Sequence, residues 1–177
     1  MPDALPRVTL VLGGARSGKS RHAETLIRAL PSPWSYIATA QPFDAEMQER
    51  IARHQEDRSE GWITVEEPLD LAAALRAQAG GPVLVDCLTL WLSNLMLSER
   101  DPEMETGRLL AALDVVAGPV VLVSNEVGMG IVPDNALARA FRDAAGRLNQ
   151  RVAAMADRVV LVVAGLPLTV KQETSHG

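Results

Sequence analysis

The sequence of 177 residues has few reactive or aromatic side chains. Its single cysteine, Cys87, excludes an internal disulfide framework and is typical of a protein from a reducing compartment. Aromatic residues make up 3% of the chain, whereas hydrophobic residues of all kinds make up 47%. We therefore expect a globular protein with an aliphatic core.

Two further features are missing. No apolar run reaches the roughly 20 residues of a membrane-spanning helix, and residues 1–7 lack the apolar core of a signal peptide. The sequence also has no excess of positive charge, since its net charge is -5. This argues against a protein that binds along the phosphate backbone of a nucleic acid. We expect a cytoplasmic protein with no membrane span and no nucleic-acid partner.

What the sequence does contain, near its start, is a glycine-rich segment between an apolar run and a helical pattern. Residues 8–12 are Val-Thr-Leu-Val-Leu, and residues 13–20 are Gly-Gly-Ala-Arg-Ser-Gly-Lys-Ser. Strand, glycine-rich loop and helix in this order are typical of a P-loop, which binds nucleotide phosphates. A glycine-rich turn without a ligand is the alternative, but a chance match in a chain of this length is about a one-in-a-hundred event.

Each part of this loop has a chemical task. Gly13, Gly14 and Gly18 allow backbone N–H groups to turn inward around a phosphate chain, where a Cβ atom would block close approach. Lys19 reaches the β- and γ-phosphates, and the hydroxyl of Ser20 is suited to Mg²⁺. The following helix points its positive dipole end at the anion.

Apolar runs and helical patterns alternate along the rest of the chain. We expect further strands at residues 34–38, 62–65, 83–85, 120–124 and 159–164. We expect helices at residues 19–30, 44–55, 69–79, 89–97, 104–117 and, after an N-cap at Asp134, to about residue 155. This predicts one α/β domain over residues 1–177, a P-loop NTPase-like, RecA-like fold with a mostly parallel sheet flanked by helices and a mobile tail from about residue 172.

Ligands of such sheets bind at the carboxyl ends of the strands. Asp86 follows the strand at residues 83–85, where P-loop proteins keep a carboxylate for Mg²⁺, and a solvated strand-end aspartate is the alternative. Cys87 beside it is better explained as a small packed residue than as a nucleophile. Residues 124–133 contain two glycines, which fits either a ligand-shaped backbone or a structural loop.

The helix expected at residues 44–55 carries a histidine. Met47, Ile51 and His54 are spaced i, i+4 and i+7, so His54 continues the apolar face of this helix. Three arginines suited to phosphate oxygens surround it: Arg50, Arg53 and Arg58. The residues alone leave two interpretations of His54 open, a packed or capping side chain and a reactive one.

Several classes of P-loop protein are excluded by missing motifs. The chain has no Asn-Lys-x-Asp segment of a Ras-type GTPase and no Ser-Gly-Gly-Gln-type signature of a transporter ATPase. A nucleic-acid translocase is usually larger and more basic. A small-molecule phosphotransferase remains.

The chain resembles the bifunctional adenosylcobinamide kinase / adenosylcobinamide-phosphate guanylyltransferase family of cobalamin biosynthesis. The resemblance spans roughly residues 8 to 171, and its specific part is the run Asn-Glu-Val-Gly-Met-Gly within residues 124–133. The other segments that carry it are residues 13–24, 36–40, 50–58 and 86–89. Some relatives have a second histidine in place of Arg53, and some have Glu in place of Asp86.

The resemblance implies two reactions. In the first, ATP or GTP phosphorylates the hydroxyl of the aminopropanol arm of adenosylcobinamide. In the second, a histidine matched by His54 takes GMP from GTP, releases pyrophosphate and passes GMP to adenosylcobinamide phosphate, which gives adenosylcobinamide-GDP. A neutral imidazole is a suitable nucleophile near pH 7.

The resemblance also implies site residues and an assembly. His54 and Lys19 are the expected catalytic residues, and Ser20 and Asp86 are the expected Mg²⁺ ligands. The expected nucleotide-binding residues are Gly13, Gly14, Ala15, Arg16, Ser17, Gly18, Lys19, Ser20, Thr39, Ala40, Gln41, Gln55, Glu56, Asp57, Arg58, Glu66 and Asp86. A homotrimer is expected.

Two alternatives remain open at this point. One is a family member with only one of the two activities, although the presence of both the P-loop and His54 favours two. The other is a GTP-binding regulator, which needs no nucleophile. A covalent GMP adduct distinguishes the enzyme from the regulator.

Overall fold

The computed structural model describes residues 4–56, 58 and 60–173, without the side chain of His54. Seven strands form one sheet in the order β3-β2-β4-β5-β1-β6-β7. The strands are β1 (Val8–Gly13), β2 (Trp34–Ala38), β3 (Trp62–Glu66), β4 (Val83–Asp86), β5 (Val120–Asn125), β6 (Arg158–Val163) and β7 (Leu166–Gln172). All neighbouring strands are parallel except β6 and β7, which confirms the predicted mostly parallel sheet.

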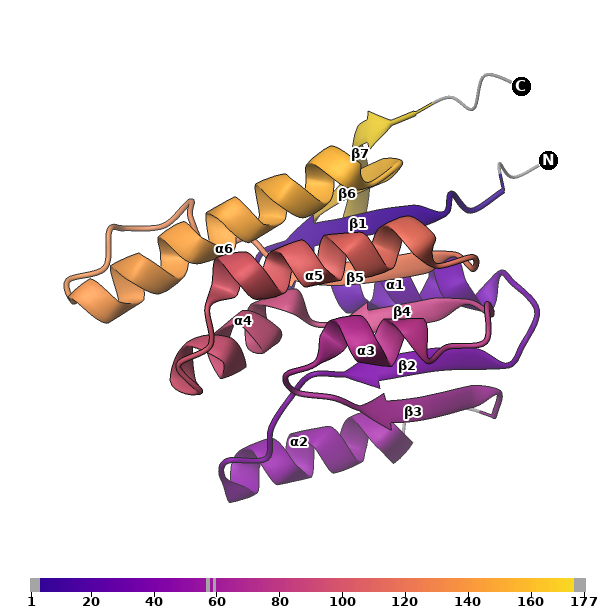
Figure 1. Cartoon of the computed structure of the whole chain (residues 1–177), viewed down its shortest axis with the longest axis horizontal. Helices are drawn as coiled ribbons and strands as arrows, with labels where there is room; N and C mark the ends of the chain where they lie inside the picture. The colour runs from indigo at the N-terminus through magenta and orange to yellow at the C-terminus, as the bar shows by residue number, and fades with distance from the viewer. Residues whose placement is uncertain (1–3, 57, 59, 174–177) are drawn as a thin grey trace.

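Helices cover both faces of this sheet (Figure 1). They are α1 (Lys19–Arg28), α2 (Ala45–Glu56), α3 (Leu71–Arg76), α4 (Leu88–Leu97), α5 (Pro102–Val115) and α6 (Ala136–Met155). Figure 1 shows α3, α5 and α6 on the near face and α1 on the far face, while α2 lies outside the edge strand β3. No helix in the described part of the chain combines the length and the apolar character needed to cross a bilayer.

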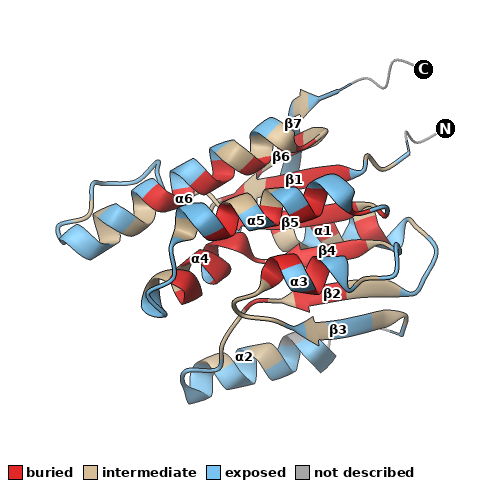
Figure 2. Ribbon diagram, in the orientation of Figure 1, coloured by how far each residue is buried: buried red, intermediate tan, exposed pale blue. Residues whose placement is uncertain are grey.

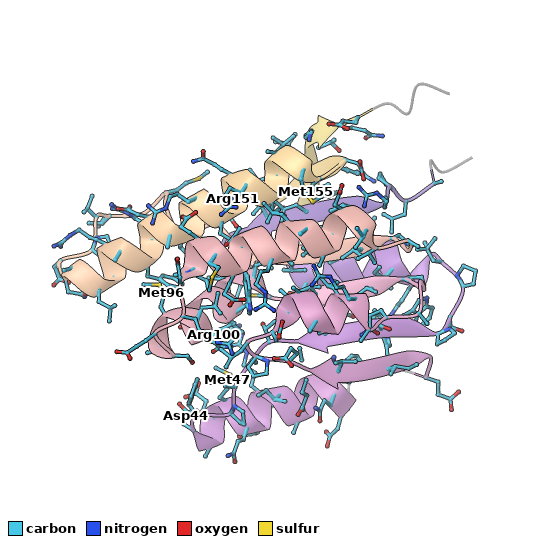
Figure 3. The ribbon with its side chains drawn as sticks, in the orientation of Figure 1. Asp44, Met47, Met96, Arg100, Arg151 and Met155 are labelled. Carbon is cyan, nitrogen blue, oxygen red and sulfur yellow. The ribbon has the colours of Figure 1, made fainter. Side chains whose placement is uncertain are left out.

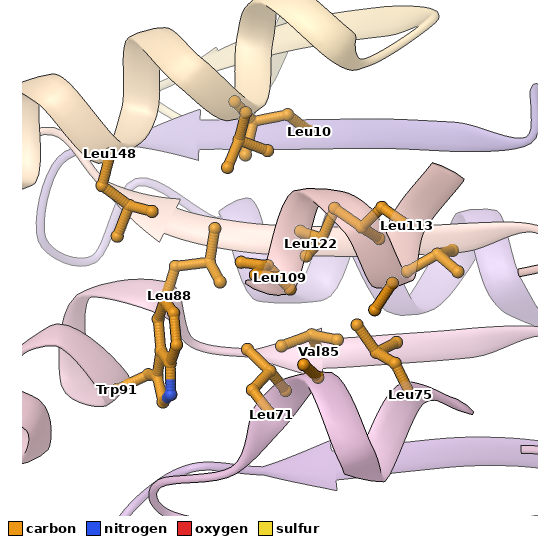
Figure 4. Close-up of a cluster of buried hydrophobic side chains, with 14 of the residues drawn as sticks. Leu10, Leu71, Leu75, Val85, Leu88, Trp91, Leu109, Leu113, Leu122 and Leu148 are labelled. Atoms are coloured by element: carbon orange, nitrogen blue, oxygen red, sulfur yellow. The ribbon is translucent and has the colours of Figure 1, made fainter. Parts of the chain in front are cut away.

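The core consists of two aliphatic layers, one on each face of the sheet. Because side chains alternate along a strand, Leu10 packs in one layer and Val11 in the other, as do Val85 and Leu84. Figure 4 shows leucines of α3, α5 and α6 converging on the first layer together with Trp91 of α4. Burial of each such aliphatic side chain contributes about 1.5–3 kcal/mol to the free energy of folding. The central strands, whose side chains are buried in both layers, are therefore stabilised most strongly.

Side-chain caps fix where several helices begin. Asp44 accepts a hydrogen bond from the backbone N–H of Met47 at 2.7 Å, as predicted for the start of α2. For α6 the prediction of Asp134 as the N-cap is wrong, because Asn135 is the N-cap and accepts from the N–H of Ala138 at 2.8 Å. An asparagine one residue later does the same task, since both side chains offer a carbonyl-type oxygen.

Two boundaries differ from the sequence-based expectation. The helix expected at residues 104–117 spans Pro102–Val115 instead, with Asp101 as N-cap and Pro102 in the first turn. The helix expected at residues 69–79 is shorter and spans Leu71–Arg76. Packing of α5 against α6 includes two ion pairs to Glu103, from Arg147 at 3.1 Å and from Arg151 at 2.9 Å, the latter labelled in Figure 3.

The antiparallel edge strand β7 is absent from the predicted elements. A two-residue turn joins it to β6, and both turn residues have positive φ, 51° at Ala164 and 79° at Gly165. Pro167 is tolerated because β7 is the outermost strand. Gln172, where the mobile tail was expected to begin, is the last residue of β7, and residues 174–177 lie outside the described part of the chain.

Candidate nucleotide-binding and catalytic site

The glycine-rich segment forms a loop between β1 and α1, as its sequence predicts. Gly18 has φ +94° and precedes Lys19, the first residue of α1. A Cβ atom on Gly18 would lie 3.2 Å from the Cα atom of Gly165 in the β6–β7 turn. The N–H of Gly165 donates to the carbonyl of Ser17 at 2.7 Å. The β6–β7 turn therefore packs against the glycine-rich loop and holds its backbone in place.

Lys19 is buried to 9% exposure although it carries an ammonium group. Its Nζ atom donates to the carbonyl oxygen of Gly14 at 3.1 Å. The side chain therefore folds back over the start of the loop, where an anion enclosed by the loop would meet the positive charge.

A cavity of about 980 Å³ opens beside this loop. Nine of the predicted nucleotide-binding residues line it: Ala15, Arg16, Ser17, Gly18, Lys19, Ser20, Ala40, Arg58 and Asp86. Seven other predicted nucleotide-binding residues are described by the structure but do not line the cavity: Gly13, Gly14, Thr39, Gln41, Gln55, Glu56 and Glu66. Asp57 lies outside the described residues.

Thr39 lies behind the cavity wall. Its side chain is fully buried, and its Oγ1 accepts from the N–H of Cys87 at 2.9 Å and donates to the carbonyl of Cys87 at 2.8 Å. Thr39 thus fixes the backbone that follows Asp86. Gln55 and Glu66 are joined by a 3.0 Å hydrogen bond, which links the end of α2 to the end of β3.

Asp86 lies in a cluster that the sequence alone did not indicate. The hydroxyl of Tyr36 donates to Oδ2 of Asp86 at 2.5 Å, and the guanidinium of Arg58 lies 3.6 Å from the centre of the Tyr36 ring. Burial, and then the charge of Asp86, raises the pKa of Tyr36, so its hydroxyl stays a donor. The cluster depends on pairing of β2 with β4, which no local pattern in the sequence reveals.

The helix that carries His54 forms the opposite wall. Met47, Arg50 and Ile51 line the cavity, and His54 follows Ile51 by three residues on the α2 backbone. Met47 lies near the start of this helix, where Figure 3 labels it. The side chain of His54 is outside what the structure describes.

The cavity lining also includes a histidine of α1 and the single cysteine of the sequence. His22 of α1 lines the cavity, and burial together with the charge of Arg158 lowers its pKa. Cys87 is buried, its Sγ accepts from the N–H of Leu90 at 3.5 Å, and burial raises the pKa of its thiol. The thiol therefore stays protonated, which agrees with the prediction of a packed residue.

Two residues of the cavity lining carry oxygen atoms that could hold a metal ion together with phosphate groups. Ser20, which carries a hydroxyl, and Asp86, which carries a carboxylate, both line the cavity. Among the described residues no group of three or more His, Cys, Asp or Glu side chains could hold a metal ion. A pair of oxygen ligands completed by substrate phosphates is the usual arrangement for Mg²⁺.

Solved structures share this fold at low sequence identity. A RadB recombinase matches with a TM-score of 0.53 and 17% identity, covering 89% of this chain and 74% of the recombinase. An ATPase from a bacterial type III secretion system matches with a TM-score of 0.51 and 12% identity, covering 94% of this chain and 59% of the ATPase. These similarities confirm the RecA-like P-loop fold.

Sequence comparison identifies nearer relatives. The family profile described as cobinamide kinase / cobinamide phosphate guanyltransferase matches residues 9–170. The bifunctional adenosylcobalamin biosynthesis protein CobP of Pseudomonas aeruginosa is 52% identical over 169 residues, 93% of this chain and 97% of the relative. The corresponding protein CobU of Salmonella typhimurium is 46% identical over 179 residues, 92% of this chain and 98% of the relative. The chain therefore belongs to the cobinamide kinase / cobinamide phosphate guanyltransferase family, which confirms the resemblance of its motifs.

Proposed function

We propose that this protein, a bifunctional cobinamide kinase and cobinamide phosphate guanylyltransferase of adenosylcobalamin biosynthesis, carries out both reactions in the cavity beside its P-loop. The observation that supports this is the composition of the cavity wall. One side is the phosphate-binding loop, and the other is the face of α2 that leads to His54.

In the kinase reaction, the hydroxyl oxygen of the aminopropanol arm of adenosylcobinamide attacks the γ-phosphorus of ATP or GTP. The bond from the γ-phosphorus to the bridging oxygen breaks, the nucleoside diphosphate leaves, and the hydroxyl proton is lost. Backbone N–H groups of the loop and the ammonium of Lys19 bind the phosphates and stabilise the charge on the transferring group.

Ser20 and Asp86 are the residues that would hold Mg²⁺. Bound there, the ion would neutralise charge on the β- and γ-phosphates. The hydrogen bond from Tyr36 occupies one oxygen of the Asp86 carboxylate and orients the side chain.

In the guanylyltransferase reaction, a nitrogen of the His54 imidazole attacks the α-phosphorus of GTP, and pyrophosphate leaves. A phosphate oxygen of adenosylcobinamide phosphate then attacks the same phosphorus, the P–N bond breaks, and adenosylcobinamide-GDP forms. Neutral imidazole is the reactive form, and the P–N bond is labile enough to pass the GMP group on. Thr39, Ala40, Gln41, Gln55, Glu56, Asp57, Arg58 and Glu66 are proposed to lie along the nucleotide.

Product analysis with two variants tests this assignment. Wild-type protein with adenosylcobinamide, GTP and Mg²⁺ is expected to give the phosphate first and then the GDP conjugate with pyrophosphate. His54→Ala should still form the phosphate but not the conjugate, whereas Lys19→Ala should lose both. Wild-type protein that makes only one of these products would support a monofunctional enzyme, and binding of GTP without either product would support a regulator.

We also propose an assembly and a location for this protein. Exposed apolar side chains lie along β6 and β7, namely Val163, Leu166, Leu168 and Val170, and they suit a homotrimer interface. Light scattering of the purified protein measures the assembly, and a monomer would contradict it. We also propose a cytoplasmic location, because a single cysteine that can form no internal disulfide is typical of proteins from a reducing compartment.

A further inference from the structure

Asn125, the last residue of β5, lies where the P-loop begins. Its register partner on β1 is Gly13, and the next residue, Glu126, donates its N–H to the carbonyl of Gly13 at 2.9 Å. On the other side of β5, Val123 pairs with Asp86. Asn125 therefore lies at the carboxyl edge of the sheet between the phosphate-binding loop and the predicted Mg²⁺ ligand, and it lines the cavity.

The position of Lys19 indicates where the terminal phosphates would lie relative to Asn125. The ammonium of Lys19 lies 3.1 Å from the carbonyl of Gly14, one residue after the register partner of Asn125. A P-loop lysine binds the β- and γ-phosphates. The side chain of Asn125 thus lies at the end of the loop where the γ-phosphate is expected, whereas α2 with His54 comes from the far edge of the sheet.

The side-chain amide of Asn125 is largely uncommitted. Its Nδ2 contacts Sγ of Cys87 at 3.8 Å, and sulfur is a weak acceptor. The side-chain amides of two other asparagines, in contrast, are used in hydrogen bonds within the protein. Asn94 donates to the carbonyls of Thr39 at 2.7 Å and Pro68 at 3.1 Å, and Asn149 uses both its oxygen and its nitrogen.

The backbone of Asn125, in contrast, is firmly held. Its N–H donates to Oγ1 of Thr89 at 2.8 Å, and its carbonyl accepts from Nδ2 of Asn149 at 3.3 Å. Ser124, 1% exposed, donates to Oδ1 of Asn149 at 2.6 Å and completes a buried polar network between α4, β5 and α6. A rigid backbone with an open amide at the cavity is the arrangement of a preorganised donor.

We propose that Asn125 is a catalytic residue of the kinase step, with its Nδ2 donating a hydrogen bond to a γ-phosphate oxygen of the bound nucleotide. This inference rests on the proposed use of the P-loop cavity for phosphoryl transfer. Negative charge in this reaction is spread over the oxygens of the transferring group, so a fixed N–H donor stabilises it. The α-phosphate, which His54 attacks, is not the group that Asn125 contacts.

The test compares the two half-reactions in the same variants, Asn125→Ala and the shape-conserving Asn125→Asp. We expect kcat for phosphorylation of adenosylcobinamide to fall about 10²- to 10³-fold, as for the loss of one oxyanion donor, and more for the aspartate because of its charge. Single-turnover transfer of GMP from GTP to His54 should fall less than about tenfold, since the γ-phosphate is not the reacting centre. Asn135→Ala, which loses only a helix cap outside the cavity, is the matched control and should keep kcat.

Two results would overturn the assignment of Asn125. One is a kinase kcat in both variants close to that of the wild type. The other is an equal loss in both half-reactions, which would indicate a purely structural role. Absence of kinase activity in the wild type would instead contradict the proposed function itself, so the two failures are distinguishable.

Discussion

Tyr36 is the single tyrosine of the chain, and its hydroxyl is committed to Asp86. Burial raises its pKa, and the charge of Asp86 adds to the effect. Because the folded pKa lies above the unfolded value of about 10, folding favours the neutral hydroxyl, and this contribution to stability is complete below pH 10 and is lost as the pH rises further.

The ultraviolet signal of tyrosinate measures this directly in metal-free buffer. We expect no phenolate absorbance from the folded protein at about pH 10, where half of it would appear in an unfolded chain. The same protein in urea is the control and should titrate normally. Half-titration of the folded protein near pH 10 would show that the Tyr36 hydroxyl is not held by Asp86.

Two glycines are expected to respond to alanine in opposite ways. Gly18→Ala should weaken nucleotide binding at least about tenfold, because its φ of +94° is unfavourable for alanine and the new Cβ meets Gly165 at 3.2 Å. Gly146→Ala, inside α6 with nothing within 4 Å, should raise the free energy of unfolding by about 0.5–1 kcal/mol and leave binding unchanged. Calorimetric titration with GTP and urea unfolding check both; normal binding by Gly18→Ala would contradict the loop geometry.

At the residue scale, the sequence predicts the site residues that are contiguous in the chain. It does not predict those that reach the site only through strand pairing. The loop from Ala15 to Ser20 lies in the cavity as its pattern indicates, and so does Asp86. Tyr36 and Asn125 also line the cavity but are not among the predicted site residues, because their positions there depend on pairing of β2 with β4 and of β5 with β1. A single sequence carries no information on such strand order.

At the element scale, the same reasoning explains the missed strand β7. Its residues do not form a long apolar run, and its stability comes from pairing with β6 and from Lys171. Nζ of Lys171 donates to the carbonyls of Ala153, Ala154 and Ala156 at 3.2, 3.0 and 2.6 Å, which satisfies the C-terminal end of α6. These contacts are between elements and leave no local signature.

Lys171→Met is therefore expected to lower the free energy of unfolding by about 1–2 kcal/mol, because α6 loses charged donors at its negative dipole end. Urea unfolding at neutral pH measures it. Glu173→Gln, which removes only the partner of an exposed ion pair with Lys171, is the control and should change stability by less than about 0.5 kcal/mol. Equal effects of the two substitutions would mean that the helix cap contributes nothing.

At the scale of the whole molecule, stability is unevenly distributed. Burial is concentrated in the central strands and in α3, α4 and α5, whereas α2 is largely exposed (Figure 2). Of its described side chains, Met47 and Ile51 are half-buried and the rest are exposed. The helix that carries His54 is thus weakly attached to the core, which suits a wall that adjusts to its substrates.

Hydrogen exchange tests this distribution. Amides of α2 should exchange faster than those of α5 in the free protein, and GTP with Mg²⁺ should slow exchange in α2. α5 serves as the internal control, since its buried side chains, such as Leu109 and Leu113, belong to the core. Equal protection of α2 and α5 without ligand would contradict the weak attachment of α2 to the core.

Transfer of label from GTP carrying radioactive phosphorus at the α-position, in the presence of Mg²⁺, shows whether His54 carries GMP. Wild-type protein and a His22→Ala variant, which removes the histidine of α1 that lines the cavity, should retain label that survives alkali and is lost in acid, as expected for a phosphorus–nitrogen bond to His54. His54→Ala should retain none. Absence of label on the wild type while GTP still binds, or label that persists in His54→Ala, would contradict a guanylylated His54.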